Sequence, residues 1–455
     1  MPSFYLMEHD PFPGYDATSG PSSLPASLPA SLPEVHRTVA VPAGAGFWRK
    51  LVAFSGPGFL IAVGYMDPGN WATDIAGGSE FEYRLIFVLL ASNLMAILLQ
   101  SLASRLGIVT GRDLAQTCRE SYSRRTSLAL WIFAEIAIAA CDLAEVIGSA
   151  IALNLLFHIP LLIGVCLTAL DVLVILYLQH RGFRLLEVVI VTLIGTIGVC
   201  YLLEILMVRP SVLGILHGFV PTTDMLTHRD MLYIGVSMLG ATVMPHNLYL
   251  HSSLVQTRAI ERTPQGLRTA IRFNFIDLFL ALNFAFLINA AILIMAAGTF
   301  YRHGLFQMAE IQDAYHTLAP LLGAPLASFL FAVALLCSGQ NSTLTGTLAG
   351  QVVMEGFLNL RLAPWLRRLV TRLLAIIPAI ITVALYGERG TARLLILSQV
   401  VLSLQLSFAV FPLVKFTSDR RKMGPFANRG WLRTLSWGVA WVIAALNAYL
   451  LVLML

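Results

Sequence analysis

The hydrophobic pattern of this chain consists of apolar runs of about 20 residues, separated by short polar segments, from Leu51 to Leu455. A helix of about 20 apolar residues crosses the hydrocarbon core of a bilayer, which is roughly 30 Å thick. The pattern therefore predicts an all-α integral membrane protein with eleven transmembrane helices. The predicted spans are residues 51–79, 85–106, 127–156, 160–179, 185–208, 231–257, 275–300, 325–356, 369–387, 391–416 and 434–455.

Polar positions interrupt the first and the sixth of these runs at matching places. The two stretches read GYMDPGNWATD (residues 64–74) and ATVMPHNLYLH (residues 241–251). Pro68, Gly69 and Pro245 break the helices, since each proline removes a backbone donor and clashes with the preceding turn. Irregular backbone at membrane depth is tolerated only where it is buried in protein or lines a cavity.

Two such breaks favour a transporter built from inverted repeats, with its substrate held where the helices unwind. The five-span halves have opposite orientation because five is odd. We assign residues 47–208 to the first repeat, 230–416 to the second and 434–455 to an extra helix. Two coincidental kinks remain the alternative on this evidence alone.

The segment before the first span has a different composition. It contains the Ser/Leu/Pro/Ala repeat SSLPASLPASLPE and has little apolar surface to bury. We therefore expect residues 1–46 to be a disordered tail and residues 47–455 to form the membrane domain. The whole chain is 57% hydrophobic and 12% charged, which is too little charge to cover a large soluble core.

The distribution of Lys and Arg predicts the orientation in the membrane. With the N-terminus inside, 24 of the 30 Lys and Arg residues lie in inner segments and 6 in outer ones. This bias places the N-terminus in the cytoplasm and, after eleven spans, the C-terminus outside. The net charge of +5 then reflects anchoring at the membrane, not nucleic-acid binding. The five cysteines show no metal-type spacing and are interpreted as packing residues.

The two breaks bring together donors that suit a divalent metal ion. Asp67 offers a carboxylate, Asn70 an amide oxygen, Ala241 a freed backbone carbonyl and Met244 a thioether. Oxygen ligands alone would suit Mg²⁺ or Ca²⁺, but a thioether is soft and favours Mn²⁺, Fe²⁺, Co²⁺ or Cd²⁺. The alternative is that Met244 only fills the core, as most of the 14 methionines do.

The third span carries three carboxylates on one helical face. Glu135, Asp142 and Glu145 are separated by seven and three residues. Carboxylates at membrane depth need partners or a water-filled path. The expected partners are Arg367 and Arg368, at the start of the ninth span. A proton relay from Asp67 to the cytoplasm is one interpretation, and a structural salt-bridge cluster is the other.

His246 follows Met244 by two residues, and histidine titrates in the physiological pH range. We expect it to tune protons or conformation near the metal; a structural hydrogen bond and direct coordination are the alternatives. His251 is interpreted as structural.

The motifs DPGN in the first span, MPHNLYLHS in the sixth and SGQNSTLTGTLAGQVVMEGF in the eighth resemble the Nramp family of proton-coupled divalent-metal transporters. The resemblance covers about residues 47–455 and is greatest to the bacterial manganese-transporting branch. It departs from eukaryotic members, because the chain has no twelfth span and only a short loop between spans seven and eight.

The resemblance implies a LeuT-like fold with a 5+5 inverted repeat and broken first and sixth helices. It implies Asp67, Asn70, the Ala241 carbonyl and Met244 as metal ligands, with Gln399 joining in occluded or outward states. It also supports Glu135, Asp142, Glu145, Arg367 and Arg368 as the proton path. The expected activity is import of Mn²⁺ and Fe²⁺ with H⁺ by alternating access across a bacterial inner membrane, with no cofactor and no obligate protein partner.

Other classes fit the sequence less well. An ATP-driven pump needs a nucleotide site, and none of the three lysines lies in a G-x-x-x-x-G-K context. A metalloprotease would need H-E-x-x-H, so we expect no enzyme. A cation-coupled amino-acid symporter of the same fold is the main alternative, although an anionic Asp67 is a poor neighbour for a substrate carboxylate. A channel is a third possibility, less suited to helices broken at the midplane.

Overall fold

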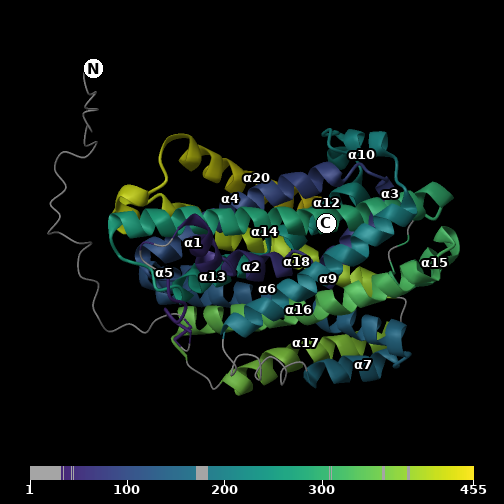
Figure 1. Cartoon of the computed structure of the whole chain (residues 1–455), viewed down its shortest axis with the longest axis horizontal. Coiled ribbons are helices and arrows are strands. Elements are labelled where there is room, and N and C mark those ends of the chain that lie inside the picture. Colours follow the sequence, from purple (N-terminus) through teal and green to yellow (C-terminus); the bar gives the residue numbers. More distant parts are fainter. Residues whose placement is uncertain are drawn as a thin grey trace.

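The computed structural model describes residues 32–33, 35–41, 44, 46–170, 183–306, 308, 310–360, 364–386 and 390–454. Within these residues the regular structure is helical apart from one isolated bridge between Val39 and Arg258. The long helices form a bundle and share one general direction (Figure 1).

Seven of the described helices are long and apolar enough to cross a membrane. They coincide with seven of the predicted spans: α4 (Ile86–Thr110), α6 (Arg124–Phe157), α9 (Phe183–Val208), α14 (Pro264–Thr299), α16 (Pro325–Leu358), α18 (Thr391–Thr417) and α20 (Gly430–Met454). The chain is therefore an all-helical protein with several membrane spans.

The other four predicted spans are not among these seven helices. The first consists of α1 (Phe47–Phe54), α2 (Pro57–Gly64) and α3 (Pro68–Phe81), and the sixth of α12 (Arg229–Val243), α13 (Pro245–Leu254) and η2 (Val255–Thr257). The fourth begins as α7 (Leu161–Leu167) and η1 (Thr168–Leu170), and its residues 171–179 lie outside the described part. The ninth is α17 (Pro364–Tyr386). The total of eleven spans stays a prediction.

Local sequence signals explain where the structure departs from the predicted boundaries. The first span is broken a second time, at Gly56, whose φ of 130° is readily adopted only by glycine, and Pro57 then starts α2. Helix α14 begins at Pro264 because the Thr263 hydroxyl caps the Gly266 amide. Short helices occupy the connections: α5 (Leu114–Ser121), α10 (Val212–Gly218), α11 (Asp224–Thr227), η3 (Tyr301–His303), α15 (Ile311–Leu322), α19 (Arg420–Met423) and η4 (Gly424–Phe426).

The two broken helices lie in the centre of the bundle. Residues 60–79 and 234–258 are all buried. Helix α3 packs against α14, α12, α18 and α6, so that long helices enclose the first break. Placing both breaks inside protein satisfies the requirement that irregular backbone avoid lipid.

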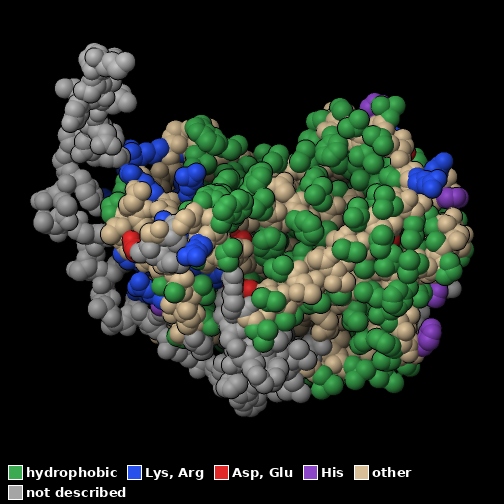
Figure 2. Space-filling model, viewed as in Figure 1, with side chains coloured by type: hydrophobic (Ala, Val, Ile, Leu, Met, Phe, Trp, Pro, Cys, Tyr) green, Lys and Arg blue, Asp and Glu red, His purple; other side chains and the backbone are tan. Residues whose placement is uncertain are grey.

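The surface of the bundle is apolar, as expected for contact with lipid acyl chains. Large side chains such as Leu202, Leu206 and Leu287 are each at least 60% exposed. Hydrophobic side chains cover most of the visible face, while Lys and Arg gather mainly at the end that carries α1 and α5 (Figure 2).

Part of the predicted disordered tail has a defined structure. Residues 35–41 run alongside residues 256–260, where Val39 pairs with Arg258. Residues 1–31 of that tail lie outside the described part of the chain.

Candidate metal site

The break in the first helix is formed by an Asp-Pro pair. Helix α2 ends at Gly64, and Asp67 adopts an extended conformation with φ −68° and ψ 165°. Its Oδ1 accepts from the Asn70 backbone amide at 2.8 Å and caps α3, whose first residue is Pro68. Aspartate is favoured at the cap because its carboxylate accepts from a free N–H of the first turn, and proline is favoured at the first position because no intrahelical bond uses its missing N–H.

The break in the sixth helix is a single residue. Met244 ends α12 and precedes Pro245, the first residue of α13. Its backbone has φ 26° and ψ 109°, a conformation rarely adopted by a residue with a side chain. Strain of this kind persists only where surrounding structure enforces it, and it clusters at functional sites.

The Asn70 side chain connects the two breaks. Its Nδ2 lies 2.8 Å from Asp67 Oδ1, 3.1 Å from the Ala241 carbonyl oxygen and 3.4 Å from the Gly64 carbonyl oxygen. Three of the predicted ligands, Asp67, Asn70 and Ala241, are therefore brought together. The amide points its nitrogen at these three oxygens, so a cation bound there needs the amide turned until Oδ1 faces it.

The other two predicted ligands lie beside the same breaks. A Cβ added at Gly64 would come within 3.1 Å of Met244 Sδ, so the thioether lies against the end of α2. Gln399 of α18 abuts Gly69, and a Cβ there would overlap its amide. Gln399 Nε2 donates to Ser398 Oγ at 2.9 Å, and within the described residues its Oε1 has no hydrogen-bond partner.

Two polar residues that were not among the predicted site residues donate hydrogen bonds to free carbonyl groups of the first break. Asn289 of α14 donates to the Tyr65 carbonyl at 2.6 Å, and Ser338 of α16 donates to the Met66 carbonyl. Asn289 Nδ2 also lies 3.4 Å from Asn70 Oδ1. The sequence signal that could have identified them is a polar residue inside an apolar run: Asn289 in LINAAIL and Ser338 in LLCSGQ.

The site is enclosed. Asp67 and Met244 have no exposed surface, and His246 is 2% exposed. A cavity of about 10 Å³ lies beside the first break, lined by Tyr65, Leu89, Asn93, Thr242, Phe286 and Asn289. It has room for about one water molecule. Metal can therefore reach or leave this site only after the helices around it move.

On α6, Cys141 lies between the acidic face of that helix and Asp67 at the first break. Cys141 Sγ lies 3.8 Å from Asp67 Oδ2 and 3.7 Å from Glu145 Oε1. Cys141 therefore contacts two carboxylates in addition to packing in the core. Asp142 and Glu145 are buried and face Gly346 of α16, where a Cβ would approach both carboxylates to 3.1 Å.

The remaining predicted site residues are Glu135, Arg367, Arg368 and His246. Glu135 accepts from Trp131 Nε1 at 2.9 Å on its own helix. The side chains of Arg367 and Arg368 lie outside the described part, although α17, which carries them, packs against α6. His246 lies in the first turn of α13, and its Nδ1 has no hydrogen-bond partner in the described structure.

The candidate ligands are not a cluster of acidic or thiolate side chains. Among the described residues, no three His, Cys, Asp or Glu side chains gather closely enough to hold a metal ion. One carboxylate, an amide, a backbone carbonyl and a thioether form a mixed set of hard and soft donors, as borderline transition metals prefer.

Known proteins share this sequence and arrangement. The sequence profile described as natural resistance-associated macrophage protein-like (Nramp) matches residues 58–453. This chain is 62% identical over 418 residues to the divalent metal cation transporters MntH of Nostoc sp. and of Listeria innocua. The aligned residues cover 92% of this chain, 95% of the Nostoc protein and 93% of the Listeria protein.

Solved structures of other transporters resemble the fold of this chain. A mutant of the Eremococcus coleocola manganese transporter superposes with a TM-score of 0.86 at 42% identity, covering 92% of this chain and 90% of that one. Inward-facing Mhp1, at 12% identity and a TM-score of 0.58, shares the LeuT-like fold, with 95% and 92% covered. The chain belongs to the Nramp family and is a divalent metal cation transporter.

Proposed function

We propose that this transporter imports Mn²⁺, and Fe²⁺ as a second substrate, together with protons by alternating access. The observation that carries the proposal is the meeting of two helix breaks at the Asn70 amide, which lies within 3.1 Å of both Asp67 and the Ala241 carbonyl. With the Asn70 amide turned so that its Oδ1 faces Asp67, a carboxylate and two carbonyl-type oxygens meet at one point, as a cation site requires.

The proposed ligands are Asp67, Asn70, the Ala241 carbonyl oxygen and Met244. Gln399 is proposed as a further ligand, since its buried Oε1 is available beside Gly69. The thioether gives the site its preference for Mn²⁺ over Ca²⁺ and Mg²⁺, because a soft donor adds little to the binding of hard cations.

The proton path is proposed to start at Asp67 and continue along α6. A dication beside Asp67 favours the ionised carboxylate, so metal binding releases a proton there. Asp142 and Glu145 are the nearest acceptors on α6, with Cys141 between Glu145 and Asp67. Glu135, Arg367 and Arg368 are proposed to extend this path, and His246 to tune it.

The enclosed site supports alternating access. We infer two inverted repeats, residues 47–208 and 230–416, followed by an extra helix at 434–455, with the broken helices at their interface. The gathering of Lys and Arg at one end of the bundle supports a cytoplasmic N-terminus in a bacterial inner membrane (Figure 2).

Uptake by proteoliposomes tests the function. We expect Mn²⁺ to accumulate faster with an inward proton gradient than without one, and we expect no uptake of amino acids under either condition. Equal Mn²⁺ uptake with and without the gradient would remove proton coupling from the proposal while leaving metal transport in place.

A further inference from the structure

The segment Val35–Val41, which we call the N-terminal strap, is docked by backbone hydrogen bonds around one isolated bridge, Val39 to Arg258. It pairs with the backbone that follows α13. The hydrogen bonds are Arg37 N to Gln256 O (3.0 Å), Val39 N to Thr257 O (3.0 Å) and Ala259 N to Val39 O (2.9 Å). Main-chain bonds of this kind give an extended peptide its affinity for an exposed backbone edge.

Side chains fix the strap at both ends. The Arg37 guanidinium donates to the Ile260 carbonyl at 3.3 Å. Val41 packs against a small apolar cluster that is separate from the main core. The buried members of this cluster are Phe54, Ile108, Val255, Ile260, Ala270 and Phe273, and α1 adds Leu51. The strap and α1 therefore share one apolar contact region.

Arg258 links the strap to the hinge between α1 and α2. Its backbone pairs with Val39, and its buried Nη2 donates to the Ser55 carbonyl at 2.6 Å and to Glu187 at 2.8 Å. At the same hinge Asp277 accepts from the Gly56 and Gly58 amides, at 3.3 and 2.7 Å. The strap's hydrogen bonds to Thr257 and Ala259 thus flank Arg258, whose side chain holds the hinge.

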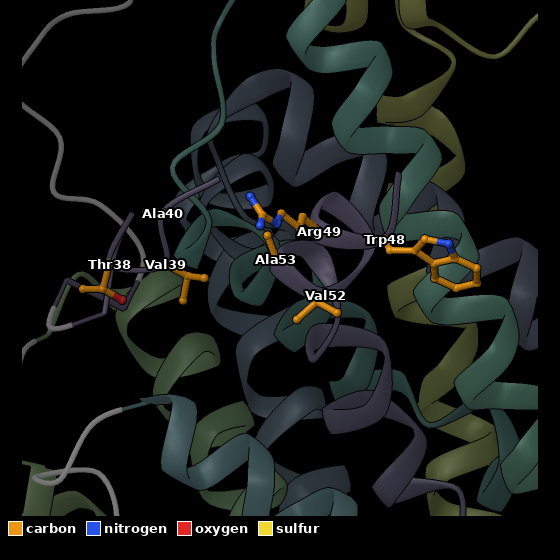
Figure 3. A pocket seen from close by; sticks show the side chains of 7 residues that line it. All are labelled: Thr38, Val39, Ala40, Trp48, Arg49, Val52 and Ala53. Atoms are coloured by element: carbon orange, nitrogen blue, oxygen red, sulfur yellow. The ribbon is translucent and has the colours of Figure 1, made fainter. Parts of the chain in front are cut away.

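Helix α1 has space to move about this hinge. An open groove of about 660 Å³ lies between the strap and α1. Figure 3 shows its lining: Thr38, Val39 and Ala40 on the strap side, and Trp48, Arg49, Val52 and Ala53 on α1. Trp48 is 75% exposed and Val52 57%. Sparse packing of this kind marks elements of low local stability.

We propose that the N-terminal strap is a built-in latch on the opening of the metal site toward the tail side of the membrane. When docked, it fixes the backbone on both sides of Arg258, whose side chain then holds the Ser55–Gly56 hinge and keeps α1 closed. Release of the strap loosens Arg258 and lets α1 swing away. The effect on transport rests on the proposed alternating access, whereas the mechanical link does not.

The variant Val39→Pro tests the latch, with Ala40→Pro as its matched control. Proline at 39 removes the donor to Thr257, and the Ala40 amide makes no such bond. The rate of hydrogen exchange of the Ser55–Leu60 backbone amides measures directly how often the hinge opens. We expect Val39→Pro to speed exchange there and to raise the initial Mn²⁺ uptake rate about twofold to tenfold, as loss of one hydrogen bond allows. Ala40→Pro should leave both near wild type.

The alternative is that the strap is a passive cover. In that case Val39→Pro speeds exchange within residues 35–41 while Ser55–Leu60 stays protected, which overturns the proposal. A chain that begins at residue 42 provides a second variant, since it lacks the strap altogether and should match Val39→Pro at the hinge. If the hinge loosens in both but wild-type protein moves no Mn²⁺, the latch stands and the proposed function fails.

Discussion

The Asn70 amide nitrogen lies 3.1 Å from the Ala241 carbonyl oxygen, although the two residues are 171 positions apart. This contact joins the broken first helix to the broken sixth helix at the one carboxylate of the proposed site. A metal ion bound there would contact both halves of the protein. A movement of either half would then change its coordination, as transport by alternating access requires.

Asp67→Ala should abolish Mn²⁺ binding and uptake, because it removes the one carboxylate proposed at the ion. We expect a loss of affinity beyond the roughly 10- to 100-fold caused by mutating an outer-shell partner of a metal site. Isothermal titration calorimetry measures it. Asp74→Asn, a buried carboxylate in the same helix, is the control. Affinity within threefold of wild type for Asp67→Ala would rule out this ligand assignment.

Met244→Ala should weaken selectivity more than it weakens binding. The oxygen ligands remain, so Ca²⁺ is expected to compete much better against Mn²⁺. Inhibition of Mn²⁺ uptake by Ca²⁺ measures this. Met238→Ala removes another buried methionine of α12 and should leave the competition unchanged. Unaltered Ca²⁺ inhibition in Met244→Ala would show that Met244 only fills the core.

The double variant Asp142→Asn with Glu145→Gln should separate proton flow from metal binding. It keeps the side-chain shapes but removes the acceptors beside Cys141. A membrane potential drives each charge with about 2.3 kcal/mol per 100 mV, so proton entry is measurable under a clamped potential. We expect Mn²⁺ binding to survive while Mn²⁺-stimulated proton entry falls sharply.

A pH-sensitive dye and Mn²⁺ flux, followed in parallel in proteoliposomes, check this result. Glu204→Gln on α9 is the control, because it removes a buried carboxylate elsewhere. Normal proton entry in the double variant would assign Asp142 and Glu145 a structural role.

Asn289→Ala should destabilise the fold by about 1–3 kcal/mol, because the Tyr65 carbonyl is left buried without a donor. Asn283→Ala on the same helix should cost less, since that amide donates to the Phe279 carbonyl of its own α14. Thermal unfolding of the purified variants in detergent compares the two. Equal losses would mean that Asn289 does not support the break.

Acidification should release the N-terminal strap. Burial and the charges of Arg37 and Arg262 hold the pKa of His36 below its ordinary value of 6.5. As the pH falls below 6.5, His36 takes up a proton in the undocked strap more readily than in the docked strap. Docking therefore weakens as the pH falls below 6.5. Above that pH the histidine is neutral in both states and has no effect.

A nitroxide attached at Thr38→Cys, in a background without the exposed Cys166, reports this release as increased mobility. His36→Gln should abolish the pH step. If the pH-dependent change in nitroxide mobility has the same size in His36→Gln, another titrating group causes the release.

Much of this architecture is determined by the sequence because the responsible forces are local. The apolar runs place the long helices, since a bilayer demands apolar side chains along each span. Pro68 and Pro245 fix both central breaks through a missing donor, and the neighbouring Asp67, Asn70 and Met244 are thereby the candidate ligands. The second break, at Gly56 and Pro57, obeys the same local rule, although the sequence analysis did not predict it.

Only the tertiary structure decided which groups satisfy those breaks and what lies beside them. Asn289 and Ser338 reach the Tyr65 and Met66 carbonyls from helices more than 200 residues away, and Cys141 lies between Asp67 and Glu145. Docking of the strap on residues 256–260 is decided in the same way. The pattern along a helix gives the face on which a side chain lies, but its hydrogen-bond partner depends on which distant helix packs there.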